Sequence, residues 1–200
     1  MPLFAAFLKL AGRRCLVVGA GPVAQEKIES LLRAGAKISV VAPAATPRVQ
    51  VWARAGKIRW QRRRFRSNDL AGMFLVVAAT SSPKLHGEIF QQARRRGVLC
   101  NSVDDPAHCD FYYGAVVRRG DLQIAISTGG HSPALAQRLR KKLEKQVGAE
   151  YQRFVARLGA AREKLFAKPI SAARRKELLH ALASEMSFQK FLRRRRASKK

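Results

Sequence analysis

"CLVVGAGPVAQEKIESLLRAGAKISVVAP", residues 15–43, has the pattern of a strand, a glycine-rich turn, a helix and a second strand. Residues 15–18 form a continuous apolar run, which is typical of a buried parallel strand. Pro22 suits the first turn of a helix, where its missing N–H costs nothing, and apolar residues then recur at helical spacing up to Leu32. These pieces predict a right-handed β-α-β unit, the beginning of a doubly wound parallel α/β sheet.

The alternation of strands and helices continues as far as residue 103. We expect further helices at residues 46–55 and 83–97, and further strands at residues 57–65, 73–80 and 98–103. Asp104 directly follows the last of these strands. Because ligands bind at the carboxyl ends of the strands in open α/β sheets, Asp104 is predicted to stand at a ligand-binding edge.

The pattern changes after Phe111. Residues 112–128, "YYGAVVRRGDLQIAIST", predict two strands joined by an "RRGD" turn, and residues 129–147 predict a glycine-rich loop that runs into a helix. From Ala149 onward the apolar spacing is helical, and the final "RRRRASKK" has no apolar period and is expected to be a frayed tail.

The motif "GAGPVA", residues 19–24, has the G-x-G-x-x-A form that binds the pyrophosphate of a dinucleotide. Gly19 permits the tight turn, Gly21 lets the backbone approach the phosphates, and Ala24 keeps helix and strand close. The helix N-terminus adds positive potential. The alternative is a glycine-rich turn that binds no nucleotide, but the position between a strand and a helix favours dinucleotide binding.

One element of the dinucleotide pattern is missing. The acidic residue that holds the ribose is expected about 20 positions after the motif, near Val41. The sequence there is "VVAPAATP", and no carboxylate follows before Asp69. Either backbone groups and hydroxyls such as Thr46 hold the ribose, or Arg48 meets the 2′-phosphate of NADP.

Asp104 and Asp105 stand together in a chain with 40 Lys and Arg but only 13 Asp and Glu. Asp favours turns, and a residue before proline is pushed out of the helical region, so turn chemistry explains such a pair. A carboxylate at the ligand-binding edge also suits a general acid or base. The residues alone leave both interpretations open.

A second glycine-rich loop, "STGGHSPALA", spans residues 127–136. Ser127, Thr128 and the two glycines after them offer N–H and O–H donors to an anion, and a basic helix follows. The alternative is simple capping of that helix by Ser132.

The formal charge of +27, spread over both halves of the chain, predicts a polyanionic partner, either a macromolecule or a small molecule rich in carboxylates or phosphates. No apolar run approaches the roughly 20 residues that span a bilayer, and no secretory signal is recognisable. The three cysteines are irregularly spaced, which favours reduced thiols in the cytoplasm. The four histidines do not cluster in the sequence and fit no zinc spacing, so we predict no metal site.

Four segments resemble, in order and spacing, the precorrin-2 dehydrogenase family, which includes the N-terminal half of bacterial sirohaem synthase. They are the opening stretch, "FLVVAATSSPKLH", "LCNSVDDP" and "DFYYGAVVRRGDLQIAISTGGHSPALAQRLRKKLE". The likeness is strong over residues 3–145 and loose in the helical remainder. The methyltransferase domain of the fused enzymes has no counterpart in this sequence, so we expect the stand-alone form.

The resemblance implies an NAD-binding Rossmann domain at residues 1–113, a dimerisation segment at residues 114–147 and a helical domain with a basic tail at residues 148–200. It implies NAD-dependent oxidation of precorrin-2 to sirohydrochlorin in sirohaem biosynthesis. Some relatives also insert ferrous iron, and others only dehydrogenate. The substrate is a polycarboxylate tetrapyrrole, which suits a basic chain. We therefore expect a homodimer with no specific nucleic acid and no membrane as partner.

The resemblance also implies the site residues. Asp104 takes the position of the family's key aspartate and is predicted to be the general base, while Asp105 is predicted to be a turn residue. The remaining positions are predicted for the cofactor at Gly19, Gly21, Pro22, Val23, Pro43, Ala44, Thr80, Asn101 and Val103, and for the substrate at Ser127, Thr128, Gly129, Gly130 and His131.

Two other classes of function remain as alternatives. A basic nucleic-acid-binding protein would explain the charge but not the glycine motif or the aspartate pair; salt-sensitive binding would reveal it. A sensor or scaffold on an inactive Rossmann fold would bind NAD without turnover.

Overall fold

The computed structural model describes residues 3–197 and divides the chain into two compact units, residues 1–113 (unit 1) and 114–200 (unit 2). Each unit is described by itself. No helix among the described residues has the length and apolar character needed to cross a membrane.

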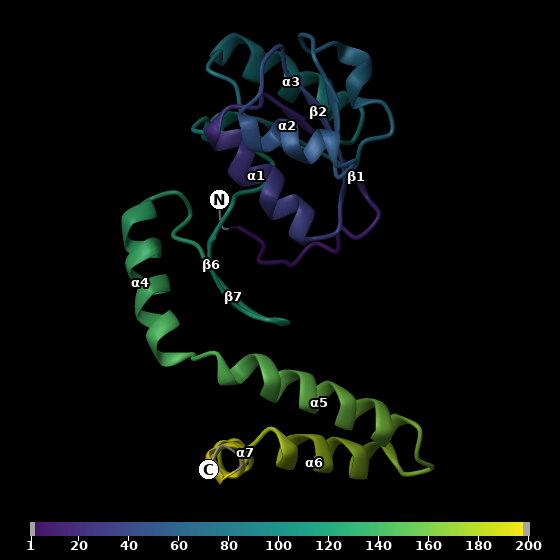
Figure 1. Cartoon of the computed structure of the whole chain (residues 1–200), viewed down its shortest axis with the longest axis vertical. Coiled ribbons are helices and arrows are strands. Elements are labelled where there is room, and N and C mark those ends of the chain that lie inside the picture. Colours follow the sequence, from purple (N-terminus) through teal and green to yellow (C-terminus); the bar gives the residue numbers. More distant parts are fainter. Residues whose placement is uncertain (1–2, 198–200) are drawn as a thin grey trace. The chain divides into compact units, whose positions relative to one another are not determined.

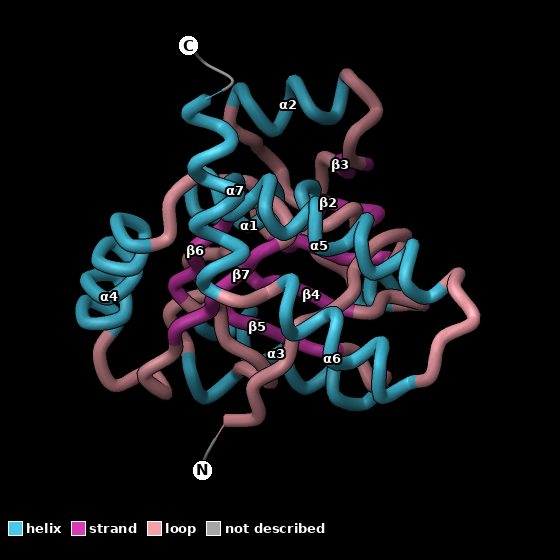
Figure 2. Tube along the Cα trace, turned by 90° about the horizontal axis from the view of Figure 1, so that it is seen from below, coloured by secondary structure: helices cyan, strands magenta, loops and turns pink. Residues whose placement is uncertain are grey.

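Unit 1 is a five-stranded parallel sheet with the strand order β3-β2-β1-β4-β5 (Figures 1 and 2). Its strands are β1 Arg14–Val18, β2 Lys37–Val41, β3 Arg59–Gln61, β4 Leu75–Ala78 and β5 Leu99–Ser102. Its helices are α1 Pro22–Arg33, α2 Pro47–Arg54 and α3 Pro83–Arg95, with short 3₁₀ turns η1 Ser67–Leu70 and η2 Pro106–His108. The doubly wound sheet predicted from the sequence is confirmed.

The central strand β1 lies between β2 and β4, with Val17 opposite Val40 on one side and Val77 on the other. Its side chains alternate between the two faces of the sheet, as the pleat requires. Cys15 and Val17 pack with α1 and α2, whereas Leu16 and Val18 pack with α3. Burial on both faces explains why the strand is apolar from Cys15 to Val18.

Proline and small polar residues begin the helices of unit 1. Pro22, Pro47 and Pro83 each occupy the first helical turn, where the missing N–H costs nothing. Thr46 and Ser82 cap α2 and α3 by accepting a hydrogen bond from the helix backbone. The N-terminus of α1 has no such cap, because Gly21 stands there.

Unit 2 contains an antiparallel pair of strands and four helices (Figure 1). They are β6 Ala115–Arg119, β7 Leu122–Ile126, α4 Pro133–Gln146, α5 Glu150–Phe166, α6 Ala172–Leu182 and α7 Glu185–Ala197. Arg119 joins the strand pair to the end of α4, because its guanidinium donates to the backbone carbonyls of Glu144 and Val147 at 2.9 and 2.8 Å.

The helices at the end of the chain share a small aromatic core. The rings of Phe154 on α5 and Phe188 on α7 lie 4.9 Å apart, and Tyr151 and Phe191 pack beside them. The prediction of a frayed tail over "RRRRASKK" is wrong as far as Ala197, because α7 continues to that residue. Aromatic anchoring of its first half lets the helix extend through arginines, which are themselves good helix formers. The rest of the predicted tail lies outside the described residues.

Candidate active site at the carboxyl edge of the sheet

A cleft of about 910 Å³ opens at the carboxyl ends of the parallel strands in unit 1. Its volume falls within the range of about 300–1,000 Å³ that is usual for cofactor and small-molecule sites. The strand order reverses between β1 and β4, which is the place where open α/β sheets bind their ligands. The lining consists of residues 18–24, 41–44, 63–65, 79–82, Leu85, Val103 and Asp104.

Gly19 has a φ of 106°, a conformation that side chains strongly disfavour. A Cβ atom at this position would collide with the backbone carbonyl of Ala79, directly after β4. Glycine therefore lets the turn after β1 lie against the turn after β4, and the fold itself requires it.

Gly21 has an ordinary φ of −74°, and a Cβ atom built there would meet no atom within 4 Å. Nothing in the chain therefore requires glycine at this position. Gly21 lines the cleft at the uncapped N-terminus of α1, whose first N–H groups lack a side-chain partner. A free helix N-terminus beside empty space fits the pyrophosphate of a dinucleotide, so the residues present suit NAD.

The end of β2 borders the cleft with Val41, Ala42, Pro43 and Ala44 and brings no carboxylate. Neither of the two side chains considered for the ribose lines the cleft. The hydroxyl of Thr46 donates to Gln25 at 2.8 Å and caps α2. Arg48 lies 3.5 Å from Glu29 and over the ring of Trp52.

The cations beside the cleft follow β3 instead. Arg63 and Arg64 line it, and Arg63 donates two hydrogen bonds to the carboxylate of Asp69 at 2.6 and 2.9 Å. Burial alone would raise the pKa of Asp69, but the bonds from Arg63 and from the Arg66 N–H outweigh it and leave that pKa below its usual value. The pair fixes the segment between β3 and η1 along the cleft.

Asp104 lines the cleft just after β5 with a φ of 60°, the one positive φ of a non-glycine residue among residues 3–197. The preceding Val103 is held by its N–H bond to the carbonyl of Ala78 at 2.9 Å. Lys27 on α1 supplies a nearby cation: burial lowers its pKa, and the charges of Glu26 and Asp104 act in the opposite direction. The ammonium group of Lys27 lies 4.1 Å from the ring centre of Tyr113.

Asn101 does not belong to the lining of the cleft, and its predicted contact with the cofactor stays a prediction. The side chain is buried, and its amide donates to the carbonyl of Phe111 at 2.8 Å and to Cys109 Sγ at 3.4 Å. It points toward residues 109–111, which follow η2, because the side chains of a strand alternate in direction. The other eight predicted cofactor residues all belong to the lining.

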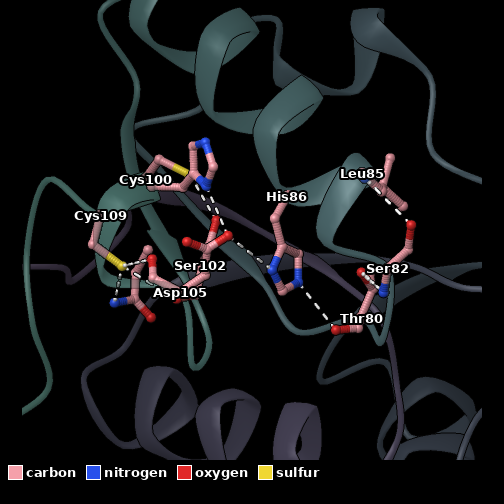
Figure 3. Close-up of polar contacts among 10 residues, drawn as sticks. Thr80, Ser82, Leu85, His86, Cys100, Ser102, Asp105 and Cys109 are labelled. Carbon is pink, nitrogen blue, oxygen red and sulfur yellow. Dashed lines mark hydrogen bonds and ion pairs between the residues drawn. The ribbon is translucent and has the colours of Figure 1, made fainter.

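Asp105 also has a different setting from the one that its position before Pro106 indicates. Its backbone N–H makes a turn bond to Ser102, but its carboxylate lies 2.7 Å from His108 Nδ1 and 3.6 Å from His86 Nδ1 (Figure 3). Two histidines that are far apart in the sequence thus meet at one carboxylate. The histidines do not cluster in the sequence, but these two meet in the fold, because the first turn of α3 lies beside the loop after β5.

The loop at residues 127–131 belongs to unit 2 and is organised by its own side chains. Ser127 Oγ accepts from the N–H of Gly129, and Thr128 Oγ1 accepts from the N–H of Ser132. Gly129 and Gly130 have φ values of 62° and 88°. Ser132 caps α4, as the alternative interpretation of this loop had it.

No cysteine is poised as a nucleophile. Burial raises the pKa of Cys15 to about 11 and that of Cys100 to about 12, and it also raises the pKa of Cys109. All three are therefore thiols at neutral pH. Within residues 3–197, no group of three His, Cys, Asp or Glu side chains is arranged to hold a metal ion.

Several lining residues escaped the motif analysis. They are Arg63, Arg64, Phe65, Ser81, Ser82 and Leu85. All of them follow the carboxyl end of β3 or β4, so the rule that identified Asp104 after β5 would have found them once the strand ends were known.

Comparison with known proteins places both units. Residues 6–115 match a family model described as "Putative NAD(P)-binding", and residues 119–146 match one described as "Sirohaem biosynthesis protein central". The first match confirms the dinucleotide binding predicted from the glycine motif.

Curated relatives include a sirohaem synthase of Nitrosococcus oceani, 40% identical over 74% of this chain, and one of Photorhabdus laumondii, 42% identical over 69%. These matches cover 31% and 29% of the relatives, so the chain spans about a third of their length. A solved structure of SirC, a precorrin-2 dehydrogenase, matches with a TM-score of 0.78 and 28% identity, over 96% of this chain and 98% of that one.

Proposed function

Because the chain belongs to the precorrin-2 dehydrogenase family, we propose that it oxidises precorrin-2 to sirohydrochlorin with NAD⁺ as the electron acceptor. The observation that carries the proposal is the position of Asp104, a carboxylate at the edge of a cleft that fits a dinucleotide. The match to SirC along nearly the whole of both chains supports the same reaction.

Different residues around the cleft would bind different parts of the dinucleotide. The N-terminus of α1 at Gly21 would hold the pyrophosphate, and the ends of β2 and β4, at Pro43, Ala44 and Thr80, would border the nucleosides. NAD⁺ supplies the capacity to accept a hydride. The lining of the cleft is mostly apolar, which would limit water at the place of that transfer.

Asp104 would act as the general base. Oxidation of precorrin-2 removes two hydrogens: one leaves carbon as a hydride and reduces NAD⁺, and the other leaves as a proton that the Asp104 carboxylate accepts. The two-electron balance is then complete without another oxidant. Lys27 on α1 is the cation near this carboxylate: burial lowers the pKa of Lys27, and the charge of Asp104 opposes that shift.

We propose that the loop at Ser127–His131 binds carboxylates of the tetrapyrrole. Its two glycines at positive φ and the hydroxyls of Ser127 and Thr128 form a tight turn, and the basic helix α4 follows it. The high positive charge of the chain favours such a polyanionic substrate over a neutral one.

The decisive variant is Asp104→Asn. Asn tolerates a φ of 60° as well as Asp does, so this change removes the base without adding the backbone strain that alanine would introduce. At saturating NAD⁺ and precorrin-2, we expect NADH formation to fall by about 10²–10⁴-fold, the usual contribution of a positioned base, with NAD⁺ affinity kept. Asp121→Asn, in the turn between β6 and β7, is the matched control.

Wild-type protein that binds NAD⁺ but forms no NADH from precorrin-2 would identify a sensor or scaffold instead. Near-wild-type turnover by Asp104→Asn would show that another group is the base. A nucleic-acid-binding protein would reveal itself by affinity that falls steeply with salt and is confined to particular sequences.

Ferrous iron insertion is the further reaction that the family resemblance leaves open. Adding Fe²⁺ after NADH formation is complete tests it in the same cuvette, through the absorbance change from sirohydrochlorin to sirohaem. Insertion requires loss of the pyrrole protons, so any such activity should also depend on Asp104.

A further inference from the structure

A group of four residues lies beside the proposed base: Thr80, His86, Asp105 and His108, here named the Asp105 cluster. Figure 3 shows His86 between the carboxylate of Asp105 and the backbone carbonyl of Thr80. His86 is nearly buried, with 7% of its side chain exposed, and Asp105 has 22% exposed. Polar groups this far from solvent need partners, and here they are one another's.

The hydrogen-bond geometry places a hydrogen on Nε2 of His86. Its Nε2 lies 3.0 Å from the carbonyl oxygen of Thr80, which can only accept, so Nε2 carries the hydrogen. The opposite nitrogen, Nδ1, faces Asp105 at 3.6 Å. On the other side of the carboxylate, His108 Nδ1 donates to the same oxygen at 2.7 Å.

The Asp105 cluster connects two segments that both border the cleft. Thr80 follows β4 and lines the cleft, whereas Asp105 follows the lining residue Asp104 after β5. His86 on α3 is in contact with both segments. A change at His86 should therefore affect the ends of both β4 and β5, which are neighbours in the sheet.

The backbone at Asp104 needs such support, because a non-glycine residue at positive φ persists only where its surroundings hold it. Val103 is fixed through its N–H bond to Ala78, and Asp105 through its N–H bond to Ser102. The Cys109 thiol also lies within bonding distance of the carbonyls of Ser102 and Asp105. The Asp105 carboxylate adds a side-chain contact from this loop to His86 on α3, and the ring of His108 adds another to Phe90.

We infer that Asp105 and His86 are positioning residues of the proposed dehydrogenation: together they hold Asp104 and Thr80 in fixed places after the neighbouring strands β5 and β4. The inference rests on Asp104 being the base, as proposed above. It assigns Asp105 a task beyond turn formation, since a residue needed only for the turn would not require its carboxylate to face two imidazoles.

Paired variants test the inference. His86→Leu removes both polar contacts, whereas His86→Gln places an amide donor where Nε2 stands and keeps the bond to Thr80. We expect His86→Leu and Asp105→Asn each to lower kcat about 10-fold with NAD⁺ affinity within about twofold of wild type, as displacement of a base by a fraction of an ångström would. His86→Gln should recover most of the loss.

His108 offers a second pair. His108→Asn keeps a donor near the position of Nδ1, and His108→Leu removes it, so the former should retain more of kcat. His180→Leu, on the exposed side of α6, is the matched control for loss of an imidazole and should leave kcat unchanged.

The double variant His86→Leu/Asp105→Asn distinguishes a shared task from two separate ones. If the residues act through one structure, the double variant should lose no more than about 10-fold, whereas independent effects would multiply to about 100-fold. Multiplied losses, unchanged kcat in the single variants, or equal losses for His86→Leu and His86→Gln would each overturn the inference.

Hydrogen exchange separates this inference from the proposed function. The N–H groups of Val103 and Asp105 are both hydrogen-bonded, and His86→Leu or Asp105→Asn should speed their exchange. If wild-type protein oxidises no precorrin-2 but exchange still accelerates in the variants, the proposed reaction fails and the structural connection remains. Unchanged exchange in the variants would count against the connection itself, whatever the reaction.

Discussion

A side chain at Gly19 would collide with the carbonyl of Ala79, whereas a methyl group at Gly21 would enter the open cleft. The two positions of the motif therefore need glycine for different reasons. Gly19 serves the packing of two strand ends, and Gly21 serves a ligand that approaches the helix backbone. This difference can be measured, because stability and affinity should respond separately.

Gly21→Ala should leave the melting temperature of the ligand-free protein unchanged or slightly raised, since its φ is −74° and nothing lies within 4 Å of the added carbon. Its NAD⁺ affinity should fall at least about 10-fold, because the methyl group occupies the space of the pyrophosphate. Calorimetric titration gives the affinity. Gly19→Ala should instead lower the melting temperature of the ligand-free protein, because its added carbon would collide with Ala79. Equal NAD⁺ affinities for wild type and Gly21→Ala would contradict the site.

Asp104 illustrates what a sequence cannot reveal at the scale of one residue. Its place after a strand follows from the pattern of apolar runs, and this was enough to predict its position at the edge. Its φ of 60° depends on the bond of the Val103 N–H to the distant Ala78 and on the turn bond of the Asp105 N–H to Ser102. The contacts of Asp105 with His86 and His108 likewise require the path of α3, which no local pattern gives.

At the scale of elements, the short segment between β3 and η1 depends on one ion pair. Arg63 holds Asp69 with two bonds, and Asp69 also accepts from the N–H of Arg66 at 2.8 Å. The pKa of Asp69 is lowered in the folded protein, so the carboxylate stabilises the fold at pH values above its unfolded pKa of about 3.9. This stabilisation is lost as the pH falls through the lower, folded pKa.

Asp69→Asn should therefore lower the melting temperature at pH 7 and make progressively less difference below about pH 4. A protein of this length changes its melting temperature by about 2–4 °C for each kcal/mol lost, which calorimetric scans detect readily. The exposed Asp121→Asn serves as control. A difference between wild type and Asp69→Asn that grows on acidification would contradict the role given to the ion pair.

The elements themselves were predictable to different degrees. β1 from Cys15 onward and β4 are apolar, and the helices of unit 1 begin at proline. The apolar runs and the prolines therefore predict the same element boundaries there. β3 spans three residues although nine were expected, because only Ser39–Val41 of β2 pair with it. Only the end of α7, from residue 193, was missed, because its arginines carry no apolar period; Phe188 and Phe191 anchor the helix through rings on α5.

At the scale of the whole molecule, we propose a homodimer formed through residues 114–147. The antiparallel pair β6–β7 packs with α4, but Ala115, Val117 and Ala136 are the fully buried residues of this segment. Two strands and one helix are too small to make an independent core, so a second copy would supply the missing surface.

Light scattering at micromolar concentration should give a mass near twice the 22.2 kDa of the chain. Ala125→Glu places a charge on the exposed side of β7, where the single chain tolerates it, and should shift the mass toward the monomer. A wild-type mass near 22.2 kDa would contradict the dimer. An unchanged dimer in Ala125→Glu would move the interface to another surface.

The strands β6 and β7 pair with each other and, within the described part of the chain, with no other strand. Each thus keeps one row of backbone donors and acceptors free, a template that recognises any extended chain regardless of its sequence. In the proposed dimer, how soon these edges are covered therefore depends on how often newly made copies meet, as well as on how stable each copy is. Slow synthesis or heavy dilution would leave these strand edges unpaired for longer. The charges of Arg118 and Arg119 on β6 disfavour irregular aggregation through them.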